Sequence, residues 1–207
     1  MELGAFLLSG GIAIESEYKH CSGIRLHTER LILRDHIPQD LPTHHSLLSD
    51  LQAMYYLQDI RSDSLETSER NLADSISQIG KTDRTLYFLR IEQRDSGHHV
   101  GEIGYTVTDF TPLGKLVHMG YFLYPIFWNH GIATEALREV QRFAFEENEV
   151  FRISTGCLAE NRASERVMQK CGMICEAEKP KMVWHNGSLK DRVEYRLLLD
   201  EWNTQNN

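Results

Sequence analysis

Apolar residues in the first third of the chain recur in two different patterns. Residues 30–35 form a short apolar run bounded by charged residues, which is typical of a strand. The segment after Pro38 and residues 68–79 instead carry apolar residues at helical spacings, and Gly80 follows as a stop signal. One strand followed by two helices is therefore predicted. The helical positions are Leu41, Leu47, Leu48 and Leu51 in the first helix, and Leu72, Ile76 and Ile79 in the second.

The period of the pattern changes at Leu86. Residues 86–91, 100–107 and 116–123 are short runs rich in β-branched and aromatic residues, and Gly, Asp and Pro clusters separate them. Residues 109–114 supply turn chemistry between the last two runs. This pattern predicts an antiparallel meander of three strands.

Helix and strand alternate after Pro125. The clearest helix of the chain comes first, because its apolar residues share one face and charged residues occupy the other. A strand over 152–157, a helix over 161–170, a strand over 173–178 and a hairpin that turns at Asn186-Gly187 complete the pattern. The apolar face of the first helix comprises Ala136, Leu137, Val140, Phe143 and Ala144.

The predicted order, β α α β β β α β α β β, describes one mixed α/β (α+β) domain. We assign residues 25–202 to this domain, since 207 residues suffice for one well-buried core. Residues 1–24, in which several glycines break any period, are expected to be an N-terminal extension, and residues 203–207 a C-terminal tail.

Charge and composition exclude several classes of function. The formal net charge of -8 repels phosphate backbones and anionic lipid, so we expect neither nucleic-acid nor membrane binding, and a cationic substrate is favoured. The 41% hydrophobic and 25% charged residues are typical of a folded domain. Four irregularly spaced cysteines form neither a disulfide framework nor a zinc set, and the apolar run 3–14 is too short and interrupted for a membrane span. We expect a cytoplasmic protein with reduced thiols.

A candidate phosphate site lies between the third meander strand and the long helix. Backbone N–H groups at a helix start, aided by the helix dipole, bind anions, and Gly131 and Ala133 would let a phosphate approach the main chain. The loop lacks the Lys and Ser/Thr of a P-loop and the full GxGxxG of a dinucleotide fold. By itself it therefore leaves the ligand open, since one Gly and one Ala before a helix are common.

Several motifs in the same order resemble the GNAT N-acetyltransferases, within them the RimJ and RimL type of ribosomal-protein N-terminal acetyltransferases. Trp128-Asn-His-Gly131-Ile-Ala133-Thr134-Glu135-Ala136 is similar to the pyrophosphate motif of that branch, with Asn129 in place of a Gly and Ile132 in place of Tyr. Residues 28–34, 101–104 and 161–173 resemble its opening, central-strand and Asn-x-x-Ser signatures, and 191–202 its closing segment. The resemblance covers residues 25–202 and implies a GNAT-type fold with a mixed, mostly antiparallel sheet.

The resemblance also implies a coenzyme site for acetyl-CoA. The strand before the loop would be splayed from its neighbour by a bulge, and its backbone at Phe122, Leu123 and Tyr124 would pair with the pantetheine arm. The amides of Asn129, His130, Gly131, Ile132, Ala133 and Thr134, with Trp128 before them, would hold the pyrophosphate. Asn161 would bond the pantetheine amides and Ser164 would face the sulfur. Without the resemblance, Asn161 would be interpreted as a helix N-cap and Ser164 as a solvent-facing helix residue.

The implied chemistry is direct attack of an amine on the thioester, which needs a base, donors to the oxyanion and an acid for the thiolate. Counting back from Trp128 to the usual position of a glutamate leads to His118, whose imidazole could accept a proton. Glu102 is the second candidate, and the relative facing of the two is open because a one-residue slip of register reverses a side chain. The Leu123 amide is the expected oxyanion donor and Ser164 the expected acid, ahead of Tyr121 and Tyr124.

Three readings of the function stay open. The first is acetylation of a primary amine, with the N-terminal α-amine of a protein or peptide as the expected acceptor. The second changes the acceptor to a small amine such as a polyamine, amino acid or aminoglycoside. The third is an acyl-CoA-binding module without turnover, which the absence of the usual glutamate at position 118 keeps alive. The family resemblance further implies a homodimer.

No metal is expected from the sequence. The pairs His44-His45 and His98-His99 could supply ligands, but spacing gives neither pair a third ligand. We therefore interpret these histidines as loop or surface residues. Cys157, near the end of a predicted strand, is interpreted as a small core residue rather than a nucleophile.

Overall fold

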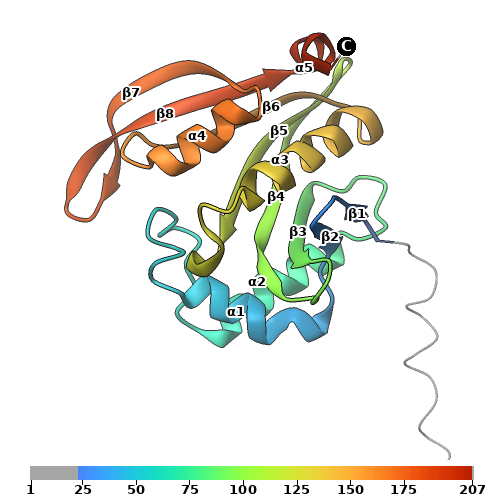
Figure 1. Cartoon of the computed structure of the whole chain (residues 1–207), viewed down its shortest axis with the longest axis vertical. Coiled ribbons are helices and arrows are strands. Elements are labelled where there is room, and N and C mark those ends of the chain that lie inside the picture. Colours follow the sequence, from blue (N-terminus) through green and yellow to red (C-terminus); the bar gives the residue numbers. More distant parts are fainter. Residues whose placement is uncertain (1–22, 207) are drawn as a thin grey trace, which may run out of the picture.

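The computed structural model describes residues 23–206, which form an eight-stranded sheet with helices on both faces (Figure 1). The strand order is β1-β2-β3-β4-β5-β6-β8-β7, and every neighbouring pair is antiparallel except β5 and β6. The mixed, mostly antiparallel sheet is the predicted fold class. The strands are β1 (Arg25–His27), β2 (Leu31–Asp35), β3 (Leu86–Gln93), β4 (His99–Thr111), β5 (Gly114–Leu123), β6 (Val150–Leu158), β7 (Ile174–His185) and β8 (Ser188–Leu198).

The helices divide between the two faces of the sheet. The face that carries Ile103 and Tyr105 packs against α3 in the main core, whereas the face that carries Glu102 contacts α1. The helices are α1 (Leu41–Ser49), α2 (Leu65–Ser77), α3 (Ile132–Arg142), α4 (Arg162–Lys170) and α5 (Leu199–Asn206). Short 3-10 turns, η2 (Pro38–Asp40) and η3 (Pro125–Phe127), precede α1 and α3, and a π-helical turn, η4 (Phe143–Glu147), follows α3.

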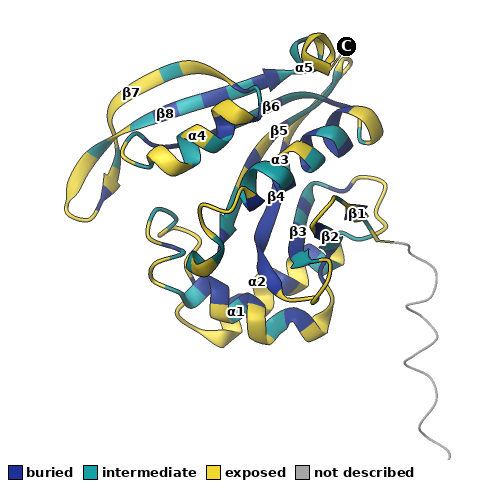
Figure 2. Cartoon of the chain, viewed as in Figure 1, coloured by how far each residue is buried: buried dark blue, intermediate teal, exposed yellow. Residues whose placement is uncertain are grey.

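The core lies between the sheet and α3. Ala136, Leu137 and Val140 are fully buried, as the predicted apolar face of this helix requires, and the stripe of buried residues is visible along α3 in Figure 2. Phe143 and Ala144 belong to the same face but lie in the π-helical turn. Burial of this face is the main force that fixes α3, and with it the loop that precedes the helix, on the sheet.

The sheet forks between β5 and β6. The two strands pair only from Lys115 to His118, and the last partner on β6 is Ser154. Beyond this point β6 continues to pair with β8, while β5 continues to pair with β4. The Thr155 hydroxyl donates to the Met119 carbonyl at 2.8 Å, next to the point of separation. The predicted splay is present, but the register irregularity in this pair lies earlier, between Lys115 and Leu116.

Several predicted boundaries differ in detail. The short strand β1 and the helix α5 have too few residues to produce a periodic signal, and both were missed. Helix α1 ends at Ser49, so Leu51 lies outside it and is 68% exposed. The β4–β5 hairpin is also tighter than the predicted turn at 109–114, because β4 reaches Thr111 and β5 begins at Gly114.

The predicted domain begins where the sheet begins, at β1. Residues 1–22, most of the predicted extension, lie outside the described residues. The predicted boundary at residue 202 falls inside α5, and Trp202 stacks on Phe145 with ring centroids 5.6 Å apart. Among the described residues, no helix is both long and apolar enough to cross a membrane.

Candidate active site

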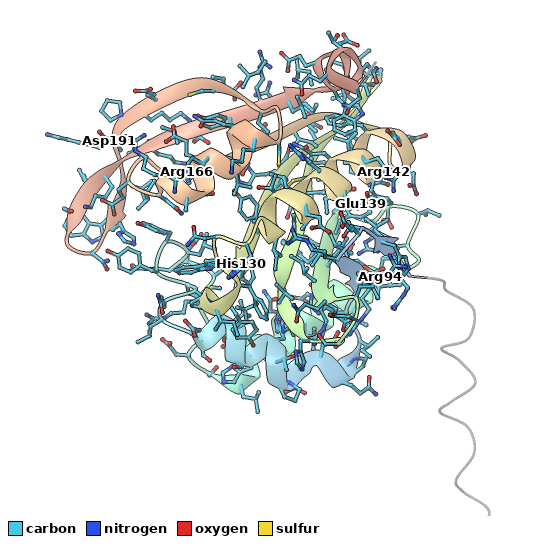
Figure 3. The ribbon with its side chains drawn as sticks, viewed as in Figure 1. Arg94, His130, Glu139, Arg142, Arg166 and Asp191 are labelled. Carbon is cyan, nitrogen blue, oxygen red and sulfur yellow. The ribbon has the colours of Figure 1, made fainter. Side chains whose placement is uncertain are left out.

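The loop before α3 presents a run of unused backbone donors. Gly131 caps the helix with a left-handed φ of 76°, and Asn129 also has a positive φ of 62°. Within the described chain, none of the amides of residues 129–134 donates a hydrogen bond. His130, labelled in Figure 3, and Asn129 are exposed, so the loop is open to solvent. Unpaired N–H groups at the positive end of a helix dipole make an anion site.

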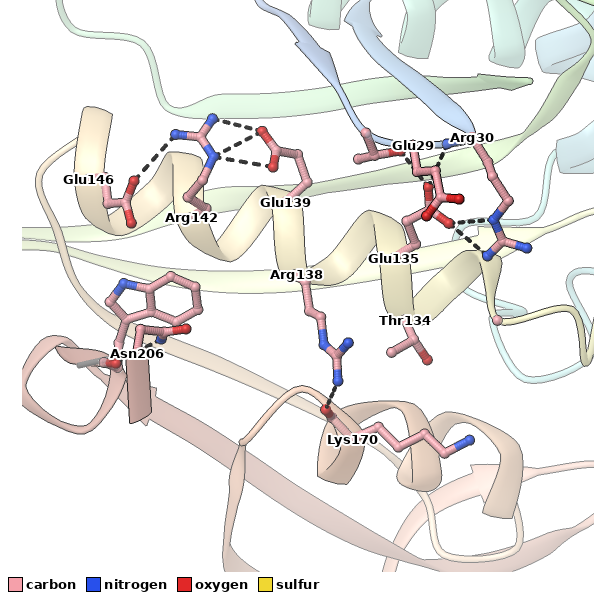
Figure 4. Close-up of a pocket in the computed structure, with 13 residues that line it drawn as sticks. Glu29, Arg30, Thr134, Glu135, Arg138, Glu139, Arg142, Glu146, Lys170 and Asn206 are labelled. Atoms are coloured by element: carbon pink, nitrogen blue, oxygen red, sulfur yellow. Dashed lines mark hydrogen bonds and ion pairs between the residues drawn. The ribbon is translucent and has the colours of Figure 1, made fainter. Parts of the chain in front are cut away.

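A clamp from the β1–β2 turn holds this loop in place. The Glu135 carboxylate, in the first turn of α3, accepts from the Thr28 hydroxyl at 2.6 Å and from the Arg30 backbone amide at 2.9 Å. The Arg30 guanidinium pairs with the same carboxylate (Figure 4). It also donates to the His130 carbonyl at 3.0 Å. The clamp joins segments more than a hundred residues apart, so sequence reasoning identified both motifs but not their contact.

A groove of about 720 Å³ runs from this loop along the outer side of α3 (Figure 4). Arg142 and Arg30 are neutralised there by carboxylates, whereas Arg138 and Lys170 have no carboxylate partner among the described residues. Arg138 donates to the Lys170 backbone carbonyl at 2.9 Å, which ties α3 to the end of α4 (Figure 4). The groove itself contains none of the predicted catalytic residues, and carboxylates and cations are equally numerous in its lining. What it adds next to the loop is therefore the two cations that have no carboxylate partner in the described chain.

The fork leaves part of the β5 backbone without a strand partner. The Tyr124 amide donates to the Val100 carbonyl on the β4 side, so the alternation of a strand turns Phe122 and Gly120 toward β4 as well. Tyr121 and Leu123 therefore face the fork. The Leu123 carbonyl accepts from the Trp128 indole at 3.0 Å. The backbone amide of Leu123 and the backbone amide and carbonyl of Tyr121 are therefore left without a partner in the described part of the chain. Of the three residues expected to expose their backbone, only Leu123 does; Phe122 and Tyr124 are turned away.

Ser164 and Tyr121 meet at the other side of the fork. Their hydroxyl oxygens are 2.9 Å apart, and the Tyr121 hydroxyl also lies 3.1 Å from the Ser164 carbonyl. Burial raises the pKa of Tyr121 well above its ordinary value, so the phenol stays protonated. Asn161 is the N-cap of α4, and its side-chain oxygen accepts from the Ser164 amide at 3.1 Å. Asn161 can therefore act as a helix cap and as a pantetheine ligand at once, because capping uses its side-chain oxygen and leaves its NH2 group available.

His118 stands at the base of the fork on an open face of the sheet. Its side chain is exposed. Partial loss of hydration against the protein lowers its pKa, the charge of Arg192 lowers it further, and the charge of Glu194 acts in the opposite direction. The imidazole is therefore neutral over a wider pH range than a free histidine, as a proton acceptor must be.

Glu102 lies on the same face of the sheet as His118 but in a closed environment. Their strands pair in register, so Thr106 opposes His118 and Glu102 lies four residues further along β4, roughly 13 Å away at 3.3 Å per residue. Glu102 is 3% exposed beneath α1, where its carboxylate bonds His44 at 2.6 Å. Burial alone would raise the pKa of Glu102, but the charge of His36 and the bond from His44 hold it below its ordinary value. The structure does not bring the two predicted bases together.

The histidine pairs differ from their expected positions. His44 and His99 are buried, 2% and 8% exposed, and both lie beside Glu102, so interpreting them as loop or surface residues was wrong. His98 is exposed, as expected. The spacing of residues on the chain gave no signal for this cluster because its members come from three separate segments. Cys157 is buried, and burial raises the pKa of its thiol to about 11, which agrees with a core residue.

Two glycines lie on the open face around His118, and one of them leaves free space. A Cβ atom at Gly120 would meet nothing within 4 Å. Across the fork, a Cβ atom at Gly156 would lie 2.3 Å from a Glu194 carboxylate oxygen, so only glycine lets this side chain cross the strand. Glu194 is held by Arg192 at 2.9 Å and by Lys179 at 3.2 Å. Ionised side chains therefore border the open face.

Comparisons with known proteins agree with this geometry. Residues 30–174 match the model of the acetyltransferase (GNAT) domain. The uncharacterized N-acetyltransferase YoaA of Bacillus subtilis (strain 168) is 27% identical over 179 residues, 84% of this chain and 96% of YoaA. The ribosomal-protein-S5-alanine acetyltransferase of Vibrio fischeri superposes with a TM-score of 0.74 at 19% identity, over 86% of this chain and 98% of its own.

A second solved structure was determined with its coenzyme bound. The spermidine N-acetyltransferase of Vibrio cholerae, in complex with CoA and spermine, superposes with a TM-score of 0.74 at 16% identity, over 85% of this chain and 99% of its own. The family match extends over most of the sheet and includes the loop before α3. The chain therefore belongs to the GNAT acetyltransferase family and is an acetyl-CoA-dependent N-acetyltransferase.

Proposed function

We propose that this enzyme acetylates the N-terminal α-amine of a protein or peptide by direct attack on acetyl-CoA in a ternary complex. The observation that carries the proposal is the continuity of unused backbone donors, from the amides of residues 129–134 to the fork-facing groups of Leu123 and Tyr121. These donors match the order of a pyrophosphate, a pantetheine arm and a thioester along one coenzyme molecule.

The coenzyme's phosphates would bind the loop amides, with Trp128 bracing the loop through its indole N–H. Arg138 and Lys170 add uncompensated positive charge beside it. Asn161 would use its free NH2 group toward the pantetheine amides. Phe122 and Tyr124 would contribute packing rather than backbone pairing, because their amides are directed at β4.

The reaction would proceed as a single acyl transfer. The neutral amine attacks the thioester carbonyl carbon, the C–N bond forms and the C–S bond breaks. The amide of Leu123 would stabilise the oxyanion, while the free backbone of Tyr121 would bond the pantetheine arm. His118 would take the proton from the attacking nitrogen through intervening water. Ser164, bonded to the Tyr121 hydroxyl, would protonate the leaving thiolate.

We assign the base to His118 rather than to Glu102 on the basis of access. His118 is exposed beside the open space at Gly120, whereas Glu102 is enclosed by α1 and already bonded to His44. A carboxylate with a lowered pKa is also the weaker proton acceptor.

The acceptor assignment is supported by similarity to proteins that modify ribosomal proteins. Besides the Vibrio fischeri enzyme, the putative ribosomal N-acetyltransferase YdaF of Bacillus subtilis (strain 168) is 31% identical over 90 residues, 44% of this chain and 49% of YdaF. A small cationic amine is the second candidate, because the chain carries a net charge of -8 and the spermidine acetyltransferase superposes equally well.

The test combines binding with turnover. Acetyl-CoA would first be titrated into the purified protein by calorimetry, and free thiol would then be followed with two acceptor panels, N-terminally free peptides and small polyamines. We expect saturable binding and peptide-dependent thiol release, with N-terminally blocked peptides as the matched control. Thiol release with polyamines but not with peptides would show that the acceptor is a small cationic amine instead of a protein N-terminus. Binding without release from any amine would instead indicate an acyl-CoA-binding module.

A further inference from the structure

Four ionisable side chains converge beneath α1, away from the fork. They are Glu102 and His99 on β4, His44 on α1, and His36 just after β2. Their exposed fractions are 3%, 8%, 2% and 2%, so the cluster is closed off from solvent. Few positions in a protein bury so many groups of this type together, because each loses its hydration when it leaves water.

Glu102 is at the centre of the cluster. Its Oε1 atom lies 2.6 Å from His44 Nδ1 and 3.8 Å from His99 Nε2, and its Oε2 atom lies 3.8 Å from His36 Nε2. One ligand atom from each of His36, His44 and Glu102 can be chosen so that all lie within 4.8 Å of one another. Three different segments of the chain therefore direct nitrogen and oxygen atoms at one small volume.

Hydrogen bonds within the protein do not account for these groups. Both ring nitrogens of His36, Nε2 of His44 and Nδ1 of His99 are buried and have no hydrogen-bond partner. Buried polar atoms are nearly always paired, with protein, water or an ion. A proton shared between His44 and Glu102 satisfies one nitrogen only, and it leaves His36 unexplained.

We propose that His36, His44 and Glu102 form a binding site for a divalent transition-metal ion of the zinc type. Two imidazoles and one carboxylate are a ligand set that Zn2+ and its neighbours accept, with a fourth position for water. Tetrahedral ligands at ~2.0–2.1 Å from zinc lie roughly 3.3 Å apart. The His44 Nδ1–Glu102 Oε1 separation of 2.6 Å is shorter than this value and the His36 Nε2–Glu102 Oε2 separation of 3.8 Å is longer. The three ligand atoms lie within 4.8 Å of one another, so side-chain movements would bring them to tetrahedral positions.

The surroundings of His36 fit the role of a metal ligand. Its Nδ1 atom lies 3.5 Å from Asp40 Oδ2 without forming a hydrogen bond, so a small rotation of the ring would let Nδ1 donate to this carboxylate and present Nε2 to a metal. Asp40 is itself fixed by Arg34 through two bonds of 2.8 Å. His99 lies outside the ligand set, because its Nε2 is engaged with the Gly101 carbonyl at 3.1 Å.

The sequence could not reveal this site, since His44 and Glu102 are 58 residues apart and spacing placed no third ligand beside His44. The site does not depend on the proposed acetyl transfer. It would tie α1 to the β2 and β4 strands beneath the acceptor side of the sheet.

Zinc binding to the untagged, chelator-treated full-length protein tests the inference. Calorimetry should give one saturable site, and Co2+ in its place should give the visible absorption of a site with nitrogen ligands. His44→Gln and His36→Gln should each weaken Zn2+ binding at least tenfold, and Asp40→Asn, next to the ligand set, about tenfold. His98→Gln, at an exposed neighbouring histidine, is the matched control, and Cys21→Ser controls for a thiol outside the described residues; both should bind as the original chain does.

The outcomes are distinct. No saturable Zn2+ or Co2+ site in the original chain overturns the proposal and leaves a protonated imidazole–carboxylate cluster. Equal affinity in folded His44→Gln and His36→Gln variants also overturns it. If those variants fail to fold, two measurements on the original chain decide whether the site exists. The site predicts a visible Co2+ spectrum and a rise in Tm with Zn2+, and a chain without the site gives neither.

Discussion

The same face of the sheet offers two contrasting environments for ionisable groups. Around Glu102, α1 covers the strands, and carboxylate and imidazoles share a closed volume. Around His118, where β5 leaves β6, the face is open and the neighbouring residue Gly120 adds no side chain. Register places the two groups only four residues apart along the β4–β5 pair. Access to solvent, rather than residue type, therefore separates a group suited to proton transfer from one suited to holding structure.

The largest effect expected concerns His118. Replacing it with Gln should lower kcat by roughly 10²–10⁴-fold, the usual contribution of a positioned base, because the attacking amine loses its proton acceptor. Affinity for acetyl-CoA should stay within about twofold. Glu102→Gln is the matched comparison, and steady-state kinetics with calorimetry measures both variants. A larger loss of kcat in Glu102→Gln than in His118→Gln would reverse the assignment.

The pH profile sharpens the same comparison. The pKa of His118 is lowered, so the protonated form that cannot act as base should appear only below the ordinary value near 6.5. In the original chain, kcat/KM should fall as the pH drops through this lowered pKa. This fall should disappear in His118→Gln. At higher pH, kcat/KM should rise as the amine acceptor loses its proton, and this rise should be seen in the original chain and in His118→Gln alike.

A charge placed in the loop should abolish most coenzyme binding. Ala133→Asp brings a carboxylate among the unpaired amides, where it would occupy donors and repel phosphate. We expect a loss of acetyl-CoA affinity of about 100-fold, or roughly 2.7 kcal/mol. Ala133→Ser adds a small uncharged group at the same position and should change affinity little. Unaltered calorimetric binding by Ala133→Asp would exclude this loop as the phosphate site.

Filling the open face should affect the acceptor alone. Gly120→Leu introduces a side chain where a Cβ atom meets nothing, so the fold should tolerate it. KM for the acceptor should rise at least about tenfold, equivalent to roughly 1.4 kcal/mol. The affinity for acetyl-CoA should not change, since the side chain of residue 120 points away from α3. An unchanged acceptor KM would show that the amine approaches from elsewhere, and Gly120→Ala serves as control.

The smallest effect is expected at the clamp. Bonds from Thr28 and Arg30 hold the pKa of Glu135 below its ordinary value, although burial alone would raise it. Because the folded-state pKa is lowered, the stabilisation is present above the unfolded value near 4.5 and is lost as the pH falls through the folded one. Glu135→Gln should therefore lower Tm by about 2–4 °C at neutral pH, for roughly 1 kcal/mol. At acidic pH this difference should shrink, which calorimetric melting at two pH values measures.

Local features were predictable from the sequence and relations between strands were not. The period of the apolar residues gave the long helix around Leu137 and the meander from Leu86, since both depend on nearby residues. The loop at Gly131 was predicted because its chemistry is carried by consecutive amides. The facing of Glu102 and His118 required the register, which one residue of slip inverts. The direction of the Phe122 and Tyr124 amides depended on the same register and was predicted incorrectly.

Contacts between segments that are distant along the chain could not be predicted from the sequence either. The Thr28–Glu135 bond joins two motifs that were each recognised, yet nothing in either motif specifies the other as partner. His44 shows the same limit, because its burial is determined by how α1 packs on β4. Tertiary packing, rather than local propensity, decides such positions.

A crystal structure with a non-hydrolysable acetyl-CoA analogue tests the central claim most directly. The account predicts phosphate oxygens within hydrogen-bonding distance of the amides between Asn129 and Thr134. It also predicts that the pantetheine arm and carbonyl group bond the backbone of Leu123 and Tyr121, on the fork side of β5. Phosphates bound away from the loop, or an arm that lies outside the fork between β5 and β6, would contradict it.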